Sequence, residues 1–283
     1  MGTNLSSWNI ILSFLLLQMQ CAQEIEGRSL KYDPQHLLQP TSTATDSSHP
    51  SSHIEHMDPS MNIFFKVDDL KAGKTMSIWF SSKDNTSASP PLLSREEAES
   101  IPFSSKQLPY LLDLFSFRKD SPQAKAMEYT LGQCEHKPMK GETKSCPTSL
   151  ESMLDFAQTV FGSDAHFKVL TTNFNDQPIV PLQNYTISKE PEVIRAPKII
   201  GCHRMPYPYS VFYCHTQESD NRLFVLSLVG DNGERVKAPG ICHMDTSQWD
   251  PAHIAFQLIR VKPRESPVCH FFPQDNLVWL PLH

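Results

Sequence analysis

The residues best suited to chemistry are four Cys-His dipeptides in the last third of the chain. They are Cys202-His203, Cys214-His215, Cys242-His243 and Cys269-His270. The gaps between them hold ten, 26 and 25 residues, and Trp279 follows the last one after eight more. Because only 7 cysteines and 12 histidines occur in 283 residues, four adjacent pairs indicate that the dipeptide is used as a unit.

The residues around the dipeptides predict β-strands. Val211-Phe212-Tyr213 precede the second dipeptide, and Phe271-Phe272 follow the fourth. Successive side chains of a strand point to opposite faces, so each dipeptide would place a thiol on one face and an imidazole on the other. If the sulfurs pair on one side, four imidazoles are free to converge on the other. The predicted metal ligands are therefore His203, His215, His243 and His270.

A zinc cage built from both residue types is the alternative interpretation of the dipeptides. Zinc half-sites usually separate their ligands by two to five residues, and adjacent ligands fit that spacing poorly. Once the thiols are oxidised, only imidazole nitrogen is offered, and the Irving–Williams order then favours copper(II) over zinc. The sequence leaves open whether the four histidines hold one ion or divide between two.

The cysteine count predicts a disulfide framework. Six cysteines remain when Cys21 is set aside, and an even set is typical of proteins that fold in an oxidising compartment. They are Cys134, Cys146, Cys202, Cys214, Cys242 and Cys269. Cys134 and Cys146 are expected to form a local bridge worth roughly 3 kcal/mol on the chain-entropy model. The other four are expected to pair among themselves, with their connectivity left open.

The start of the chain predicts a signal peptide over residues 1–22. Residues 8–17 are apolar, too short a run to span a bilayer, and small residues follow at Cys21-Ala22. Met1-Gly2 with Ser6 also matches a myristoylation pattern, which is the competing interpretation. Secretion agrees with two glycosylation sequons, which begin at Asn85 and Asn184.

Composition divides the rest of the chain into two regions. Residues 23–61 are rich in Ser, Thr, Pro and His, lack apolar periodicity and predict a flexible linker. Its three histidines could capture a metal loosely, although a solvated linker is the simpler interpretation. Residues 62–282 predict a folded domain. A net charge of −6 argues against nucleic acid or an anionic membrane as partner.

Periodicity within residues 62–282 predicts an α+β fold: a helical N-terminal half packed on a disulfide-stapled, mainly antiparallel β C-terminal half. Predicted helices begin at Ser94, near Leu108, at Ser121-Pro122 and at Thr148, the last ending at Gly162. Predicted strands cover residues 63–65, 76–80, 168–172, 185–188, 198–203, 210–215, 223–229, 254–261 and 277–280. A hairpin turn is expected at Asp231-Asn232-Gly233.

The spacing of the dipeptides and Trp279 resembles the hallmark of the plant BURP-domain family. The sequence around the dipeptides also resembles that of the family in these segments: Gly201-Cys202-His203-Arg204-Met205-Pro206-Tyr207, Cys242-His243-Met244-Asp245, Val268-Cys269-His270-Phe271-Phe272-Pro273, and Phe64-Phe65 upstream. Cys134 and Cys146 resemble the two extra cysteines of the family. The likeness runs from about residue 62 to 280, and the short N-terminal part resembles the unknown-seed-protein (USP)-like subgroup.

The resemblance implies a secreted or vacuolar protein with a role in seed or tissue development or in stress responses. Some family members are copper-dependent peptide cyclases, and the four histidines match their copper-binding positions. No core peptide is evident here, because the segment that begins at Gln39-Pro40 has Asp46 at its eighth position. Cyclisation of a separate Tyr- or Trp-containing peptide is therefore the enzymatic alternative. A cell-wall component is a third candidate partner. No catalytic residue is assigned, and hydrolase and nucleotide-binding motifs are absent from the sequence.

Overall fold

Two antiparallel β-sheets form the framework of the computed structural model, which describes residues 63–80, 90–174, 180 and 182–282. The strands are β1 (Phe64–Phe65), β2 (Thr75–Trp79), β3 (Glu142–Ser145), β4 (Phe167–Leu170), β5 (Asn173–Phe174), β6 (Leu182–Ile187), β7 (Glu192–Ile194), β8 (Ile200–Met205), β9 (Val211–Gln217), β10 (Asn221–Gly230), β11 (Arg235–His243), β12 (Val268–Phe271) and β13 (Leu277–Pro281). The helices are α2 (Arg95–Ser100), α3 (Leu108–Leu114), α4 (Pro122–Glu135), α5 (Leu150–Phe161) and α6 (Ile254–Leu258), with 3-10 turns at Val67–Asp69 and Ser105–Gln107.

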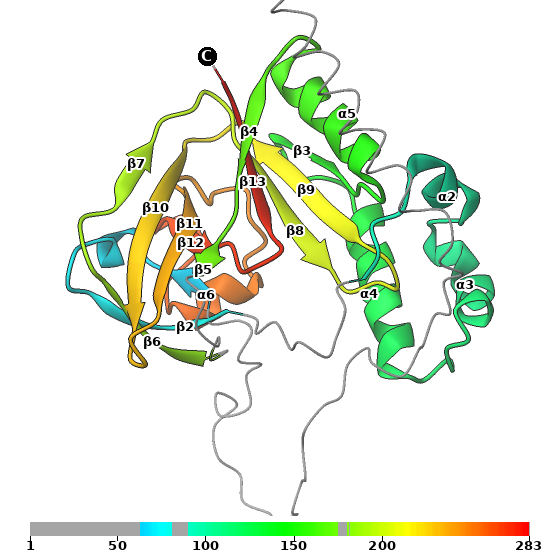
Figure 1. The fold of residues 1–283 in the computed structure, drawn as a ribbon, viewed down its shortest axis with the longest axis horizontal. Coiled ribbons are helices and arrows are strands. Elements are labelled where there is room, and N and C mark those ends of the chain that lie inside the picture. Colours follow the sequence, from blue (N-terminus) through cyan, green and yellow to red (C-terminus); the bar gives the residue numbers. More distant parts are fainter. Residues whose placement is uncertain (1–62, 81–89, 175–179, 181, 283) are drawn as a thin grey trace, which may run out of the picture. The chain divides into compact units, whose positions relative to one another are not determined.

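Each sheet contains one of the two antiparallel strand pairs that carry the dipeptides: β8 and β9 in the five-stranded sheet, β11 and β12 in the eight-stranded sheet. The eight-stranded sheet follows the order β1-β12-β11-β10-β6-β2, with β5 also on β11 and β7 also on β10. The five-stranded sheet follows the order β3-β9-β8-β13-β4. In Figure 1, β10, β11 and β12 lie on one side of β8 and β9, and helices α2 to α5 lie on the other. The dipeptide strands β8 and β9 are thus next to β11 and β12.

The fold class is confirmed in its mainly antiparallel sheets, but the prediction of a helical N-terminal half is wrong. Strands β1 and β2 come from the start of the described region and join the eight-stranded sheet, where they pair with β12 and β6. Strand β3 lies between helices α4 and α5 and pairs with β9. The apolar residues of these short segments are buried by long-range strand pairing, which local periodicity does not reveal.

The predicted strand over residues 254–261 is a second error, because this segment begins with helix α6. Its apolar residues Ala255 and Phe256 are buried with Trp249 and Val268 in a small separate cluster. A run of this length and composition fits a buried helix turn as well as a strand. Tertiary packing selects the helix.

Most of the other local predictions are confirmed. Ser94 and Glu97 form the expected capping box of α2, and Ser121 caps α4 with proline in the first turn. Helix α5 ends at Gly162, which has a φ of 110°. Glycine adopts this backbone conformation without strain, whereas residues with a Cβ atom do not. The N-cap of α5 is one residue later than predicted, at Ser149.

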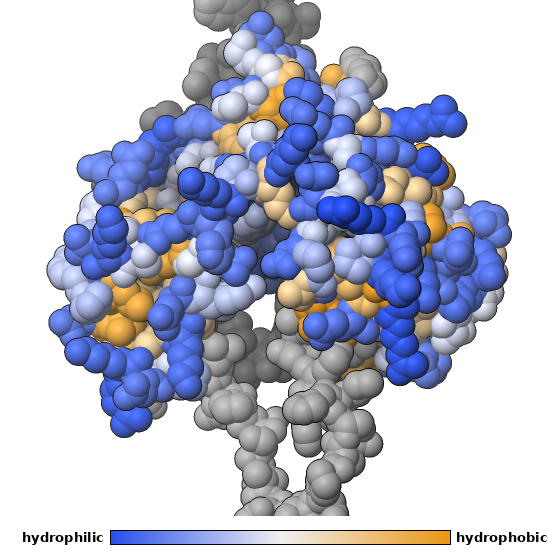
Figure 2. Space-filling model, turned by 180° about the vertical axis from the view of Figure 1, so that it is seen from behind, coloured by the Kyte–Doolittle hydropathy of each residue, from blue (hydrophilic) through white to orange (hydrophobic). Residues whose placement is uncertain are grey.

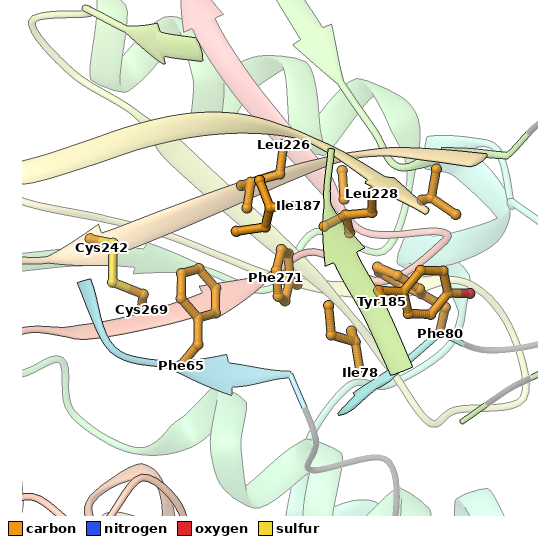
Figure 3. Packing of buried hydrophobic residues seen from close by; sticks show 12 residues of the cluster. Phe65, Ile78, Phe80, Tyr185, Ile187, Leu226, Leu228, Cys242, Cys269 and Phe271 are labelled. Carbon is orange, nitrogen blue, oxygen red and sulfur yellow. A yellow bond between two sulfur atoms is a disulfide. The ribbon is translucent and has the colours of Figure 1, made fainter. Parts of the chain in front are cut away.

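The apolar core is divided among several clusters on the faces of the two sheets. In the eight-stranded sheet, one cluster runs from the disulfide of Cys242 and Cys269, with Phe65 beside it, through Phe271 to Tyr185 and Phe80 at the other end (Figure 3). In the five-stranded sheet, helix α5 covers Cys202, Cys214 and Trp279. The face shown in Figure 2 is mostly hydrophilic, with small separate hydrophobic patches. None of the helices in the described ranges is long and apolar enough to cross a membrane.

Candidate metal centre

The sulfurs of the four dipeptides form two bridges, each between directly opposite residues of neighbouring strands. Cys202 pairs with Cys214 across β8 and β9, and Cys242 pairs with Cys269 across β11 and β12. All four side chains are completely buried in the apolar clusters. The local bridge expected between Cys134 and Cys146 is also present. The six predicted cysteines therefore form three disulfides.

The four histidines lie on the opposite faces of the same strands and gather between the two sheets. The Nε2 atoms of His203 and His215 are 3.4 Å apart, and those of His243 and His270 are 3.3 Å apart. The two pairs also meet each other: ring centroids of His203 and His270 are 5.2 Å apart, and those of His215 and His243 are 6.3 Å apart. Strand alternation thus separates sulfur from imidazole at each dipeptide.

The second ring nitrogen of three of the four histidines faces a hydrogen-bond acceptor. His215 Nδ1 lies 3.0 Å from Glu142 Oε1, and His243 Nδ1 lies 2.8 Å from Asn221 Oδ1. His270 Nδ1 lies 3.2 Å from the carbonyl oxygen of Phe271. The fourth ring, His203, is hydrogen-bonded to Asn276 just before β13. Because a carboxylate and a carbonyl only accept, these contacts place the proton on Nδ1.

The Nε2 atoms of His243 and His270 therefore face each other as bare lone pairs with no hydrogen between them, and His215 presents a bare Nε2 to His203. An edge of about 3.3 Å is what a tetrahedral ion with nitrogen ligands at roughly 2.0 Å would require. The separations in the structure match that tetrahedral edge, and the square-planar arrangement that copper(II) prefers would bring the two nitrogens of each pair closer together. No three His, Cys, Asp or Glu side chains within the described ranges already stand in ligating positions, so the four histidines form two pairs rather than one complete ligand set.

Aromatic rings and one glycine shape the space beside the imidazoles. Phe272 stacks on His203 at a centroid distance of 4.9 Å and lies at the same distance from His270. A Cβ atom on Gly201 would lie 3.0 Å from Phe272 and 3.6 Å from His203 Nε2. A cavity of ≈ 10 Å³, about the space of one water molecule, adjoins His215, His243 and His270. These observations fit a single small ion.

The comparisons with known proteins agree with this architecture. The profile of the BURP domain matches residues 63–281. The chain belongs to the BURP domain family. It is 44% identical over 275 residues to the BURP domain-containing protein BNM2A of Brassica napus, an alignment that covers 95% of each chain. It is 45% identical over 240 residues to the BURP domain protein USPL1 of Arabidopsis thaliana, covering 83% of this chain and 85% of the relative. These relatives agree with the USP-like subgroup.

Burial favours the neutral form of three imidazoles of this BURP domain, those of His203, His243 and His270. Loss of solvation, reinforced by the neighbouring rings, lowers the pKa of His203 and His243 well below the usual value. Burial lowers the pKa of His270 to about 4, partly opposed by its bond to Phe271. Neutral imidazole is the form that binds metals, so protons compete weakly for these nitrogens.

Other predicted site residues lie elsewhere. Asn184 is exposed on β6, and its Nδ2 donates to Asp231 at 3.1 Å, while Asn85 lies outside the described residues. Glycosylation at both stays a prediction, as do the signal peptide and the linker. His253, outside the four dipeptides, lies beside Trp249, with ring centroids 4.7 Å apart.

The sequence analysis missed the residues that orient the histidines, chiefly Glu142 and Asn221. Asn221 of β10 is directly opposite His243. Glu142 of β3 is offset by two residues from the position directly opposite His215, on the neighbouring strand. Neither residue belongs to a recognisable motif, so only strand register reveals them. Trp249 was missed as well; its ring lies 5.1 Å from that of His243 and covers it.

Proposed function

We propose that this USP-like BURP protein holds one copper(II) ion between its two sheets, with His203, His215, His243 and His270 as ligands. The observation that carries the proposal is the pair of facing Nε2 atoms in each sheet, of which those of His215, His243 and His270 are left bare by acceptors at Nδ1. Two unprotonated nitrogens at this distance repel each other unless a cation lies between them.

The donor set supports copper over other metals. All six cysteines of the domain are in disulfides, so thiolate is not offered and the donors are imidazoles. A nitrogen-only set favours copper(II) over zinc by the Irving–Williams order. When bound, copper would supply a centre that changes oxidation state. The chain itself would supply fixed ligand directions and an apolar wall of Phe272.

The three disulfides support passage through the secretory pathway, where such bridges persist. A developmental or stress role rests on the resemblance to USP-like relatives alone. Cyclisation of a separate peptide stays a prediction, and incubation of the copper-loaded protein with a Tyr- or Trp-bearing peptide tests it. A loss of about 2 Da from the peptide would indicate oxidative coupling.

Metal analysis of the protein secreted from eukaryotic cells tests the copper site. We expect one copper per chain, and quenching of the fluorescence of Trp249, which lies beside His243. The double variant His215→Ala/His243→Ala should lose the metal and the quenching. His136→Ala is the control, because this residue caps α4 away from the cluster.

Full copper content in the double variant would contradict the proposal. Two ions per chain would contradict the shared ion and assign one to each pair. Preferential retention of zinc during competition with copper would contradict the choice of metal.

A further inference from the structure

One buried carboxylate stands out among the partners of the four histidines. Among the residues that the structure describes, Glu142 is the only charged group that accepts from any of these rings, and its side chain is only 4% exposed. Its Oε1 faces His215 Nδ1 at 3.0 Å and also accepts from the hydroxyl of Tyr213 at 3.1 Å. Its Oε2 accepts from the amide of Met139 at 2.9 Å. The carboxylate is thus held at both oxygens.

The hydrogen bonds to Glu142 outweigh the cost of its burial. Loss of solvation alone would raise the pKa of this carboxyl, but the bonds from His215, Met139 and Tyr213 bring it below its usual value. Contacts from His215, Tyr213 and the Met139 amide thus surround the carboxyl, an arrangement suited to a buried carboxylate. A bond to an ionised acceptor is roughly twice as strong as one between neutral groups.

Glu142 sits on a short strand at the edge of its sheet. Strand β3 lies at the edge and its register extends over four residues, all paired with β9. Two further contacts tie it to helix α4. Cys146, which follows the strand, is bridged to Cys134, and Lys144 Nζ donates to the carbonyl of Gln133 at 2.6 Å. Without these ties an edge strand of this length would fray readily.

The bridge of Cys134 and Cys146 differs from the other two in its exposure. The four dipeptide cysteines are completely buried, whereas these two are partly exposed. The evident structural effect of this bridge is to keep β3, and so Glu142, against β9.

We propose that Glu142 is a positioning residue for His215 and that the bridge of Cys134 and Cys146 is its tether. The carboxylate keeps the proton on His215 Nδ1 and turns Nε2 toward His203. Charged partners of this kind make a histidine a stronger ligand, and losing one typically weakens metal binding by about 10–100-fold. The metal part of this inference rests on the proposed function, but the orientation of His215 does not.

Nitrogen-15 NMR of the imidazoles in the metal-free protein tests the orientation directly. We expect the Nδ1–H form of His215 in the wild type, and a mixture of both tautomers in Glu142→Ala. Glu234→Gln and Glu234→Ala are matched controls, because Glu234 is a buried carboxylate that also accepts from a tyrosine, Tyr185, but contacts no histidine. An unchanged tautomer in Glu142→Ala, with the fold intact by circular dichroism, would overturn the proposal.

Copper titration then tests the consequence for the site. Glu142→Gln, which keeps the size of the side chain and removes the charge, should bind copper about 10–100-fold more weakly and change its electron paramagnetic resonance spectrum. Glu234→Gln should change neither. Equal affinity and spectrum in Glu142→Gln and the wild type would contradict a positioning role.

The tether is tested by the double variant Cys134→Ala/Cys146→Ala. It should shift the His215 tautomer and weaken copper binding in the same direction as Glu142→Gln, and it should add little when combined with that substitution. Additive losses would show that the bridge acts elsewhere. If the wild type binds no metal while Glu142→Ala still changes the tautomer, the copper proposal fails and the positioning role stands.

Discussion

The two dipeptide-bearing strand pairs share one plan but differ in their surroundings. In β8–β9 and in β11–β12, opposite cysteines are bridged and the following histidines lie diagonally on the other face. In the first pair His203 and His215 are partly exposed, and a carboxylate from an edge strand orients one of them. In the second, His243 and His270 are buried and their partners are neutral.

This difference shows that the repeated dipeptide specifies the donors but not their environment. The eight-stranded side is a buried, neutral wall, because His243 and His270 are buried and their hydrogen-bond partners carry no charge. The five-stranded side carries the charge and depends on the short strand β3. We therefore expect the stability of the domain to depend more on the second pair and the tuning of the metal site to depend more on the first.

Removal of the dipeptide bridges should have the largest effect. The chain-entropy model gives a loss of about 3 kcal/mol for a closed loop of the size of Cys202 to Cys214, and about 3.5 kcal/mol for Cys242 to Cys269, since the separations are 12 and 27 residues. Chemical unfolding of the two double Cys→Ala variants measures both. A greater loss from Cys202→Ala/Cys214→Ala would reverse the expected order.

Two glycines offer a finer comparison, because each lies next to a dipeptide but on a different face. A Cβ on Gly201 would approach Phe272 and His203 Nε2, whereas one on Gly240 would lie 3.2 Å from Phe65 on the sulfur side. Both alanine variants should lose about 1–3 kcal/mol by overpacking. We expect only Gly201→Ala to reduce copper uptake as well, measured by titration. Equal copper affinities would show that the space beside His203 is not used.

The two buried carboxylates should respond oppositely to pH. Burial raises the pKa of Glu234 above 4.5, whereas that of Glu142 is lowered. The folded protein therefore keeps the proton of Glu234 to a higher pH than the unfolded chain does. The stabilisation that results is complete below pH 4.5 and is lost as the pH rises through the pKa of Glu234 in the folded state. Glu234→Gln should remove that loss and make the metal-free protein relatively more stable at pH 7. Unfolding curves from pH 4 to 8 measure it, and a destabilised variant at pH 7 would contradict the burial cost.

The smallest effect is expected for Asn221→Ala. Its bond to His243 is between neutral groups and is worth about 0.5–1.5 kcal/mol, and the buried ring is also held by Trp249. Copper affinity should therefore fall less than in Glu142→Gln. A greater fall in copper affinity would show that Asn221, in the eight-stranded sheet, influences the site more than Glu142 does.

Local sequence rules account for much of this structure and fail at identifiable places. The caps at Ser94 and Ser121 and the turn at Asp231-Asn232-Gly233 are confirmed, because such signals act within a few residues. The helical N-terminal half was wrong, because Phe64 and Phe65 form a strand only through pairing with β12, some two hundred residues later. The local sequence of a short apolar segment does not indicate which distant strand it pairs with.

By itself the sequence determined that sulfur and imidazole leave each dipeptide in opposite directions, since alternation is a property of any extended backbone. It also determined the family, through the spacing of four dipeptides and Trp279. Only the tertiary structure decided which cysteines are opposite, that the two histidine pairs face each other, and that Glu142 and Asn221 orient them. Those facts depend on strand register and on the packing of the two sheets, which join residues far apart in the chain.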